Sequence, residues 1–385
     1  MSLSKYISLM EIQLYLTKKR ELQLQLLKYI ENPNIAGEEY ENLTIFLTKI
    51  NLRNNQDELR ILFRLLLAIA NNHYRNSLFF KKIEQIFLFL KDDIKSTFTN
   101  FEIYEIFQTS KLILLILFTN QIIDIDMAIF EKIIQKDKYF WFFFYPELKN
   151  FHTKERLKEI EKELLEINPD IFNNFNEKRQ KGENDSPLCS LIRNDSIKEF
   201  VLYLNLNNVS IRSDVKPSIF ETNPILFEKC SLIEYSVFYG SNKIFLYLQQ
   251  KLSEPNPIFL YATHSWNPKT IQIAEDKVVG INKNILKEAI KCHNNDIAIY
   301  LCNNYLIDEC MNDIISCCFQ YGNFLFLPTS IQTIQFFLFA CQYNYLDLVK
   351  ILLKNCKIDI NEKIHMEIKK NIFFTIIFLI KKKFE

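Results

Sequence analysis

The sequence contains little glycine: 385 residues include Gly37, Gly182, Gly240, Gly280 and Gly322, where average usage is about 7%. No two of these glycines lie close enough to form a phosphate-binding loop, so the dinucleotide-binding and Walker A patterns are absent. Few glycines also leave few positions for tight hairpins, whereas Leu, Ile and Lys are abundant. The composition therefore predicts an all-α fold.

An excess of charge of either sign is also missing. Lys and Arg number 47 and Asp and Glu number 46, so the formal net charge is 47 − 46 = +1. A chain this close to neutral has no net field that would attract nucleic acid or anionic lipid. We therefore expect no nucleic-acid partner, and nothing in the composition indicates an oligomeric state.

Long apolar runs, a signal peptide and a disulfide framework are absent as well. No apolar run reaches the roughly 18–20 residues that span a bilayer, and the nearest, Ile372 to Ile380, is interpreted as a buried terminal helix. The segment from Met1 to Ile7 lacks the apolar core of a secretion signal. Nine cysteines without regular spacing indicate reduced thiols. We expect an intracellular, cytoplasmic protein without a membrane span.

Patterns typical of catalysis and metal binding are not found. No Cys-x-x-Cys or His-x₃₋₅-His spacing accompanies Cys292 and His293, so core or surface thiols are a better interpretation than a zinc site. No nucleophile elbow or catalytic cysteine signature accompanies any of the widely spaced histidines. We therefore assign no catalytic, cofactor-binding or metal-binding residue and expect a non-enzymatic protein without a cofactor.

Residues 1–167 show helical periodicity with polar breaks, which predicts an all-helical N-terminal domain, either a bundle or a short solenoid. Several of its helices begin with side chains that cap helices: Asp57, Ser77, Asn100, Asp126 and Thr153. The predicted helices are Leu3–Ile30, Glu39–Ile50, Asp57–Ala70, Ser77–Lys91, Asn100–Phe118, Asp126–Lys136 and Thr153–Ile167.

Three further segments carry distinct patterns. The aromatic run from Tyr139 to Tyr145, before Pro146, is interpreted as a helix end or turn that plugs the core rather than as a ligand site or docking surface. Residues 168–185 are polar and lack periodicity, which indicates a linker. Residues 207–230 are too long for an ordinary connection between helices and are expected to form an insertion or a protruding loop.

The most informative stretch runs from Phe336 to Asn361. A short apolar helix with a small residue at Ala340 is followed by a turn at Asn344, a residue type that tolerates a positive φ. A second helix then has an apolar stripe at Leu348, Val349, Leu352 and Leu353. An Ile-Asp-Ile-Asn segment, 358–361, leads the chain onward.

The same arrangement of a helix residue, small in most copies, followed four positions later by a turn recurs along residues 186–385. The copies are 22 to 45 residues apart, and the weakest has Cys318 and Gly322. In the order of helix residue and turn residue, they are Leu191 and Asp195, Ser236 and Gly240, Ala262 and Trp266, Ala289 and His293, Cys318 and Gly322, and Ala340 and Asn344. The spacing scatters around the ankyrin period of about 33 residues.

These copies resemble the ankyrin repeat, whose consensus has a small pair of residues, a turn glycine, a second helix ending in Leu-Leu, and a closing Gly-Ala-Asp-Val-Asn. Ser186 to Cys189 is the nearest match to its Thr-Pro-Leu-His opening. Together with 182–196, 216–223 and 232–235, the copies look like degenerate ankyrin-repeat proteins expanded in trichomonad-like protists, whose C-terminal half is a domain of unknown function. The resemblance covers roughly residues 180–360.

The resemblance implies that residues 186–385 form a degenerate ankyrin-repeat solenoid of about six repeats plus a terminal helix. Together with the helical periodicity of 1–167 and the polar linker at 168–185, this predicts a chain of two domains. The resemblance also implies that an unidentified partner protein binds the concave surface, through the two residues that precede each turn. Ser265 and Cys292 occupy such positions, and the predicted partner-binding residues are Arg193, Asn194, Phe238, Tyr239, His264, Lys291, Gln320, Tyr321, Gln342 and Tyr343.

We accordingly expect an intracellular protein–protein interaction module or scaffold. The alternative is a substrate-recruiting adaptor or a divergent enzyme whose activity resides in residues 1–167. That alternative depends only on the two-part layout, because the sequence singles out no residue for either activity.

Overall fold

The computed structural model describes residues 3–35, 37–50, 52, 55–227, 229–252, 258–275, 283–305, 311–327 and 333–355. Within these ranges the chain is built from α-helices and contains no β-strand; one isolated bridge joins Asp214 and Ser231. The predicted all-α fold is therefore confirmed, and the protein has a helical, repeat-like character. The predicted terminal helix and the Ile358–Asn361 segment lie outside the described residues.

The chain forms two compact units, and neither is continuous in sequence. The first unit combines Met1–Asn32 and Ala36–Leu65 with Ala289–Glu385, and the second combines Leu66–Glu288 with Pro33–Ile35. The segment 168–185 lies inside the second unit, and the domain boundary expected there stays a prediction.

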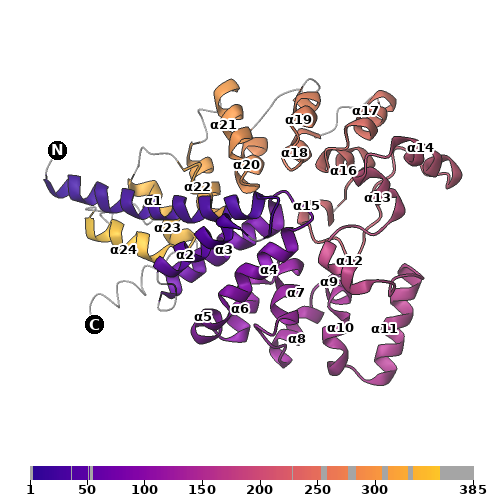
Figure 1. Ribbon diagram of the computed structural model, residues 1–385, viewed down its shortest axis with the longest axis horizontal. Coiled ribbons are helices and arrows are strands. Elements are labelled where there is room, and N and C mark those ends of the chain that lie inside the picture. Colours follow the sequence, from indigo (N-terminus) through magenta and orange to yellow (C-terminus); the bar gives the residue numbers. More distant parts are fainter. Residues whose placement is uncertain are drawn as a thin grey trace, which may run out of the picture. The chain divides into compact units, whose positions relative to one another are not determined.

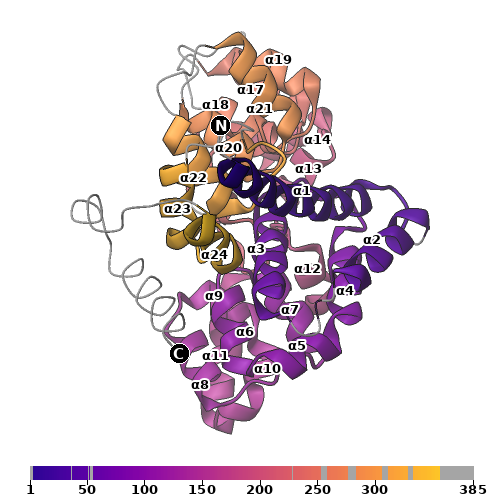
Figure 2. The ribbon, with the colours of Figure 1, turned by 90° about the vertical axis from the view of Figure 1, so that its left-hand side faces the viewer.

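In the first unit, the long helix α1 packs against α2 and against α24 (Figures 1 and 2). Apolar side chains of α1 such as Ile12 and Leu16 are buried, as are Leu348 and Leu352 of α24. The helices of this unit are α1 (Leu3–Glu31), α2 (Glu38–Lys49), the first half of α3 (Gln56–Asn72), the end of α20 (Lys283–Lys291), α21 (Asn295–Asn304), α22 (Met311–Tyr321), α23 (Thr333–Gln342) and α24 (Leu346–Asn355).

The second unit begins with short helices and continues as pairs of helices standing side by side (Figure 1). The short helices are α4 (Phe79–Phe89), α5 (Lys91–Thr97), α6 (Asn100–Phe107), α7 (Lys111–Thr119), α8 (Met127–Ile134), α9 (Lys138–Phe143), α10 (Tyr145–Leu148), the 3₁₀ turn η2 (Lys149–Phe151), α11 (Lys154–Ile167) and α12 (Phe175–Lys181). The later helices are α13 (Pro187–Arg193), α14 (Ile197–Leu206), α15 (Pro224–Phe227), α16 (Leu232–Phe238), α17 (Asn242–Lys251), α18 (Ile258–Ala262) and α19 (Pro268–Glu275).

Capping side chains set several of these helix starts. Asp126 and Thr153 cap α8 and α11 as predicted. The single helix predicted over Asn100–Phe118 is wrong, because the chain breaks after Phe107 and Ser110 caps a new helix by accepting from the backbone N–H of Ile113. Apolar periodicity continues across this break, so it concealed the new start.

Two predicted caps are shifted and a third is absent. Thr99 rather than Asn100 caps α6, in a reciprocal capping box with Glu102. Asn55 rather than Asp57 accepts the N–H of Glu58 at the start of α3. Helix α4 begins after Leu78 without a side-chain cap, so Ser77 does not perform that role.

The aromatic run is part of the core, as predicted: Phe140, Phe142, Phe143, Phe144 and Tyr145 are buried, and Pro146 stands at the start of α10. The expectation of a protruding loop at 207–230 is wrong. Its residues Val215, Ile219 and Phe220 are buried, and the last two pack in one cluster with Phe142 and Tyr145. These long-range apolar contacts hold a segment that has no periodic pattern of its own.

Each recurring turn found in the sequence is left-handed. The helix pairs α13/α14, α16/α17, α18/α19, α20/α21 and α23/α24 are each joined at such a turn, whereas no second helix follows Gly322 within the described residues up to 327. The φ angles are 49° at Asp195, 67° at Gly240, 49° at Trp266, 59° at His293, 68° at Gly322 and 55° at Asn344. Only glycine adopts this region without a steric cost, which explains why the sequence has small, polar or well-packed residues there.

A repeated backbone hydrogen bond closes five of these turns. The residue after the turn donates its N–H to the carbonyl of the recurring helix residue, as in Ser241 to Ser236 at 2.9 Å and Tyr345 to Ala340 at 2.8 Å. This is the long bond of a Schellman motif, which satisfies a carbonyl at the end of the helix. The equivalent donors and acceptors elsewhere are Ser196 and Leu191, Asn294 and Ala289, and Asn323 and Cys318.

The side chain after the turn also ties neighbouring pairs together inside each unit. In the second unit, Ser241 donates to the carbonyl of Ile192 at 2.6 Å. In the first unit, Asn323 donates to the carbonyl of Ile290 at 2.9 Å, and Tyr345 donates through its hydroxyl to that of Phe319 at 2.7 Å. In each case the accepting residue comes directly after the recurring helix residue of the preceding copy. The residue after each of these turns therefore closes its own turn through its backbone N–H and bonds to the preceding copy through its side chain.

Candidate functional site

The residues preceding the turns differ in exposure between the two units. In the first unit, Gln320 and Gln342 are exposed, and Lys291, Tyr321 and Tyr343 are half-buried. The amine of Lys291 lies 5.9 Å from the centre of the Tyr321 ring, and the Tyr343 hydroxyl is 3.0 Å from that of Ser316. These side chains are therefore oriented by their neighbours while part of each remains accessible. We call this set of five residues the turn-edge surface.

In the second unit, Asn194 is exposed and Arg193 and Phe238 are half-buried, whereas His264 is packed into its surroundings. His264 is 2% exposed, stacks on Phe238 with ring centres 5.0 Å apart, and forms an ion pair or hydrogen bond with Glu288 at 2.9 Å. Tyr239 is half-buried, and its ring lies 4.8 Å from that of Tyr235. Ser265 is buried as well, and in the first unit Cys292 is also buried. The predicted partner contacts at these positions stay predictions.

The first of the predicted pairs, Arg193 and Asn194, lines a pocket of about 490 Å³ in the second unit. The loop from α3 to α4, helices α4 and α7, the end of α12 and helix α13 form its wall. Phe79, Phe80 and Leu112 provide apolar surface, whereas Arg75, Lys181, Glu183 and Arg193 provide charge. The volume is within the roughly 300–1,000 Å³ range of small-molecule sites.

Arg75 is held in the pocket wall by neutral acceptors. Its guanidinium donates to the hydroxyl of Thr222 at 2.6 Å, to the carbonyl of Ala70 at 2.8 Å and to that of Gly182 at 3.4 Å. Its Nε is buried and has no hydrogen-bond partner within the described part of the chain. Burial lowers the pKa of Arg75, although the more distant charges of Glu221 and Glu183 act in the opposite direction.

Arg193, in contrast, has a carboxylate partner. Its Nε lies 3.0 Å from Glu183, and one terminal nitrogen donates to the carbonyl of Asn184 at 2.9 Å and to the hydroxyl of Tyr235 at 2.6 Å. Burial works against its charge, but Tyr235 and Glu183 outweigh it and raise the pKa of Arg193 above its ordinary value. The Glu183 carboxylate thus neutralises this arginine and not Arg75.

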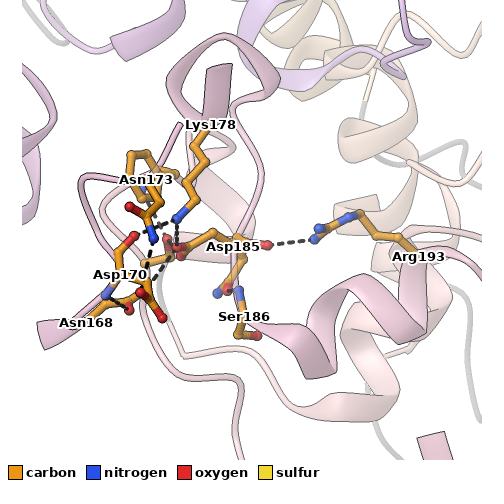
Figure 3. A network of polar contacts seen from close by, with 10 residues as sticks. Asn168, Asp170, Asn173, Lys178, Asp185, Ser186 and Arg193 are labelled. Carbon is orange, nitrogen blue, oxygen red and sulfur yellow. Dashed lines mark hydrogen bonds and ion pairs between the residues drawn. The ribbon is translucent and has the colours of Figure 1, made fainter. Parts of the chain in front are cut away.

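A polar network fixes the segment that carries Glu183 (Figure 3). The carboxylate of Asp185 lies 3.3 Å from the amine of Lys178 and accepts from the side-chain amide of Asn168 at 3.2 Å and the hydroxyl of Ser218 at 2.8 Å. Because these bonds connect α12 with the start of α13, the charged side chains between the two helices are held in a defined position.

Gly182 is required where this segment meets Arg75. It has a φ of 65°, and a Cβ at this position would lie 2.5 Å from the hydroxyl of Thr222 and 3.3 Å from the Arg75 guanidinium. Glycine therefore allows both the left-handed end of α12 and the close approach of the arginine.

Sequence reasoning found Arg193 and Asn194 through the turn register but missed Arg75, Lys181 and Glu183. Glu183 and Lys181 stand in the polar segment expected to be a linker, and Arg75 follows a helix that is far away in sequence. No local pattern signals that a fold will bring such residues to one cavity.

Comparison with protein-family models, with curated proteins and with solved structures finds no match to this chain. No helix among the described residues combines the length and the apolar character needed to cross a membrane.

Proposed function

We propose that this protein is a non-enzymatic protein-binding module, and that the turn-edge surface of the first unit contacts the partner. The observation that carries the proposal is the position of its side chains. Gln320 and Gln342 are exposed and Tyr321 and Tyr343 half-exposed at equivalent positions of successive copies, each next to a left-handed turn.

This arrangement suits recognition of a protein surface. Tyrosine offers a large contact area with a polar tip, which is why it is enriched at interfaces. The glutamines can donate and accept hydrogen bonds at the same edge. The turns behind them are closed by backbone bonds such as Tyr345 to Ala340 at 2.8 Å, so binding would require little ordering of the backbone.

The resemblance of the sequence to ankyrin repeats supports the same conclusion, because that family binds partner proteins beside its turns. The repeated helix pairs and their left-handed turns are compatible with this resemblance. The second unit contributes less to the proposed contact surface, since Phe238 and His264 stack on each other there.

The test is affinity capture with the full-length protein from its own cells, followed by mass spectrometry. The double variant Gln320→Arg and Gln342→Arg adds bulk and charge to the turn-edge surface without changing a buried group. We expect it to lose the captured partner while keeping the circular dichroism spectrum and melting temperature of the unchanged protein.

The matched control is Gln135→Arg with Gln250→Arg, because both glutamines are exposed and lie outside the turn-edge surface. This control should retain the partner. Equal capture by both double variants, with both folded, would exclude the turn-edge surface as the binding site.

A further inference from the structure

We propose that the pocket between α4, α12 and α13 in the second unit binds a small organic phosphate monoester, with the phosphate placed among Arg75, Lys181 and Arg193. The pocket shares no residue with the turn-edge surface. The proposal therefore does not depend on the proposed function.

The first support is an excess of positive charge among the residues that line the pocket, although the buried Glu221, which is not among them, also acts on Arg75. The charged residues of the lining are Arg75, Lys181, Arg193 and Glu183, which sum to 3 − 1 = +2. Glu183 pairs with Arg193 at 3.0 Å. Within the described residues Arg75 forms no ion pair, and Lys181 is exposed and forms none either. A phosphate monoester carries a charge of about −1.5 to −2 at neutral pH, which matches this excess.

The second support is the unused donor of Arg75. A buried polar group without a partner is rare, because its desolvation is not compensated by a hydrogen bond. The Nε of Arg75 is such a group within the described part of the chain, whereas the terminal nitrogens of the same guanidinium are anchored to Thr222 and Ala70. The Nε–H of Arg75 is therefore a spare donor beside the pocket, and a phosphate oxygen that reaches it would accept its hydrogen bond.

The third support is the size and the apolar part of the lining. A water molecule takes up about 30 Å³ of the liquid, so 490 Å³ has room for far more than an inorganic phosphate. Phe79, Phe80 and Leu112 line the same pocket, and the Arg75 guanidinium lies 5.9 Å from the centre of the Phe79 ring. The pocket therefore suits an anionic group joined to a flat or apolar body.

Calorimetric titration of the full-length protein with four probes tests the ligand class. The probes are phenyl phosphate, adenosine 5′-monophosphate, adenosine and inorganic phosphate. We expect saturable binding of at least one monoester, binding of inorganic phosphate at least tenfold weaker, no binding of adenosine, and weaker monoester binding at higher salt. The proposal is overturned if adenosine binds as tightly as its monophosphate, or if inorganic phosphate binds as tightly as the better monoester. It is also overturned if neither monoester binds up to about 10 mM, which is ten times the Kd of a millimolar complex.

Three variants locate the site. Lys181→Met should weaken monoester binding by roughly three- to fivefold, the effect of one exposed charge, whereas Lys158→Met, which removes an exposed lysine of α11, should leave it unchanged. Glu183→Gln removes the partner of Arg193 and should tighten binding by a similar factor. If binding occurs but neither Lys181→Met nor Glu183→Gln changes it relative to Lys158→Met, the ligand occupies another site and the proposal fails.

Discussion

Replacement of Gln23 by Ala is the most direct test of how the first unit is held together. Gln23 lies on α1 and is fully buried. Its amide nitrogen donates to Nδ1 of His293 at 2.8 Å and to the side-chain oxygen of Asn323 at 2.9 Å, and its oxygen accepts the N–H of Leu325 at 2.8 Å. A residue near the N-terminus thus bonds with the turns of two late copies.

These contacts also fix the proton of His293. Because the amide of Gln23 donates to Nδ1, that nitrogen must be the acceptor. Nε2 then carries the hydrogen and donates to the carbonyl of Tyr321 at 3.1 Å. All polar atoms of the Gln23 side chain are used, so the truncation to Ala leaves three neighbouring groups without their partner.

The expected destabilisation follows from these bonds. Each hydrogen bond contributes roughly 0.5–1.5 kcal/mol net, so three of them sum to about 3 kcal/mol. This is a large fraction of a typical free energy of unfolding of about 5–15 kcal/mol. In a double-mutant cycle with Asn323→Ala, we expect a coupling of about 1 kcal/mol, because the two side chains share one direct bond.

The assay is urea denaturation followed by circular dichroism, combined with amide hydrogen exchange of peptides from α22. Gln25→Ala is the matched control, since Gln25 is half-exposed on the same helix and, among the residues that the structure describes, bonds only to Glu21 of that helix. The control should change stability by less than about 0.5 kcal/mol. If Gln23→Ala lowers the free energy of unfolding as little as the control does and leaves hydrogen exchange in α22 unchanged, the bonds from α1 do not hold the late turns in place.

The remaining predictions concern single positions. Asn344→Gly should raise the free energy of unfolding by roughly 0.5–1 kcal/mol in urea melts, because φ at this exposed turn is 55° and glycine adopts it without the cost of a Cβ; a loss of stability would contradict this. Asp195→Ala should cost about 1 kcal/mol, since its carboxylate accepts the N–H groups of Lys243 and Ile244 at the start of α17, and Asp195→Asn should recover part of that loss. Burial lowers the pKa of Lys111 from 10.5 to about 8, so between these pH values the unfolded chain holds a proton that the folded chain has released. The free energy of unfolding should therefore rise with pH in this window by up to about 1.4 kcal/mol per pH unit relative to that of Lys111→Met. Parallel pH profiles of the two proteins would contradict the shift. Among the described cysteines Cys302 alone is exposed, so iodoacetamide with mass spectrometry should find it labelled first in the native protein, and equally fast labelling of the buried Cys341 would contradict the structure.

The turns show which features local chemistry determines. A recurring helix residue followed by Gly, Asn or Asp four positions later indicated where helices end, and the left-handed φ at Gly240, Asn344 and Asp195 confirms those positions. Trp266 and His293 occupy the same conformation although neither favours it. The neighbouring contacts of His293 with Gln23 and Tyr321 show how tertiary packing stabilises such a turn.

Where local signals conflict with long-range packing, prediction failed. The break before Ser110 was hidden by an uninterrupted apolar pattern, and the segment 207–230 buries irregularly spaced residues such as Val215, Ile219 and Phe220, so it has no periodicity. The pocket could not be predicted for the same reason, since Arg75 and Thr222 meet only after the second unit has folded.

The amino-acid sequence by itself determined that the chain is helical and where its recurring turns lie, because helix propensity, apolar spacing and the tolerance for a positive φ act over a few residues. Only the tertiary structure decided that α1 packs with the last helices and that two arginines and a lysine surround one cavity. Such contacts join positions 300 residues apart or more, as between Gln23 and Asn323. Their formation depends on the entropy of closing long loops and on the fit of whole surfaces, which no short stretch of sequence encodes.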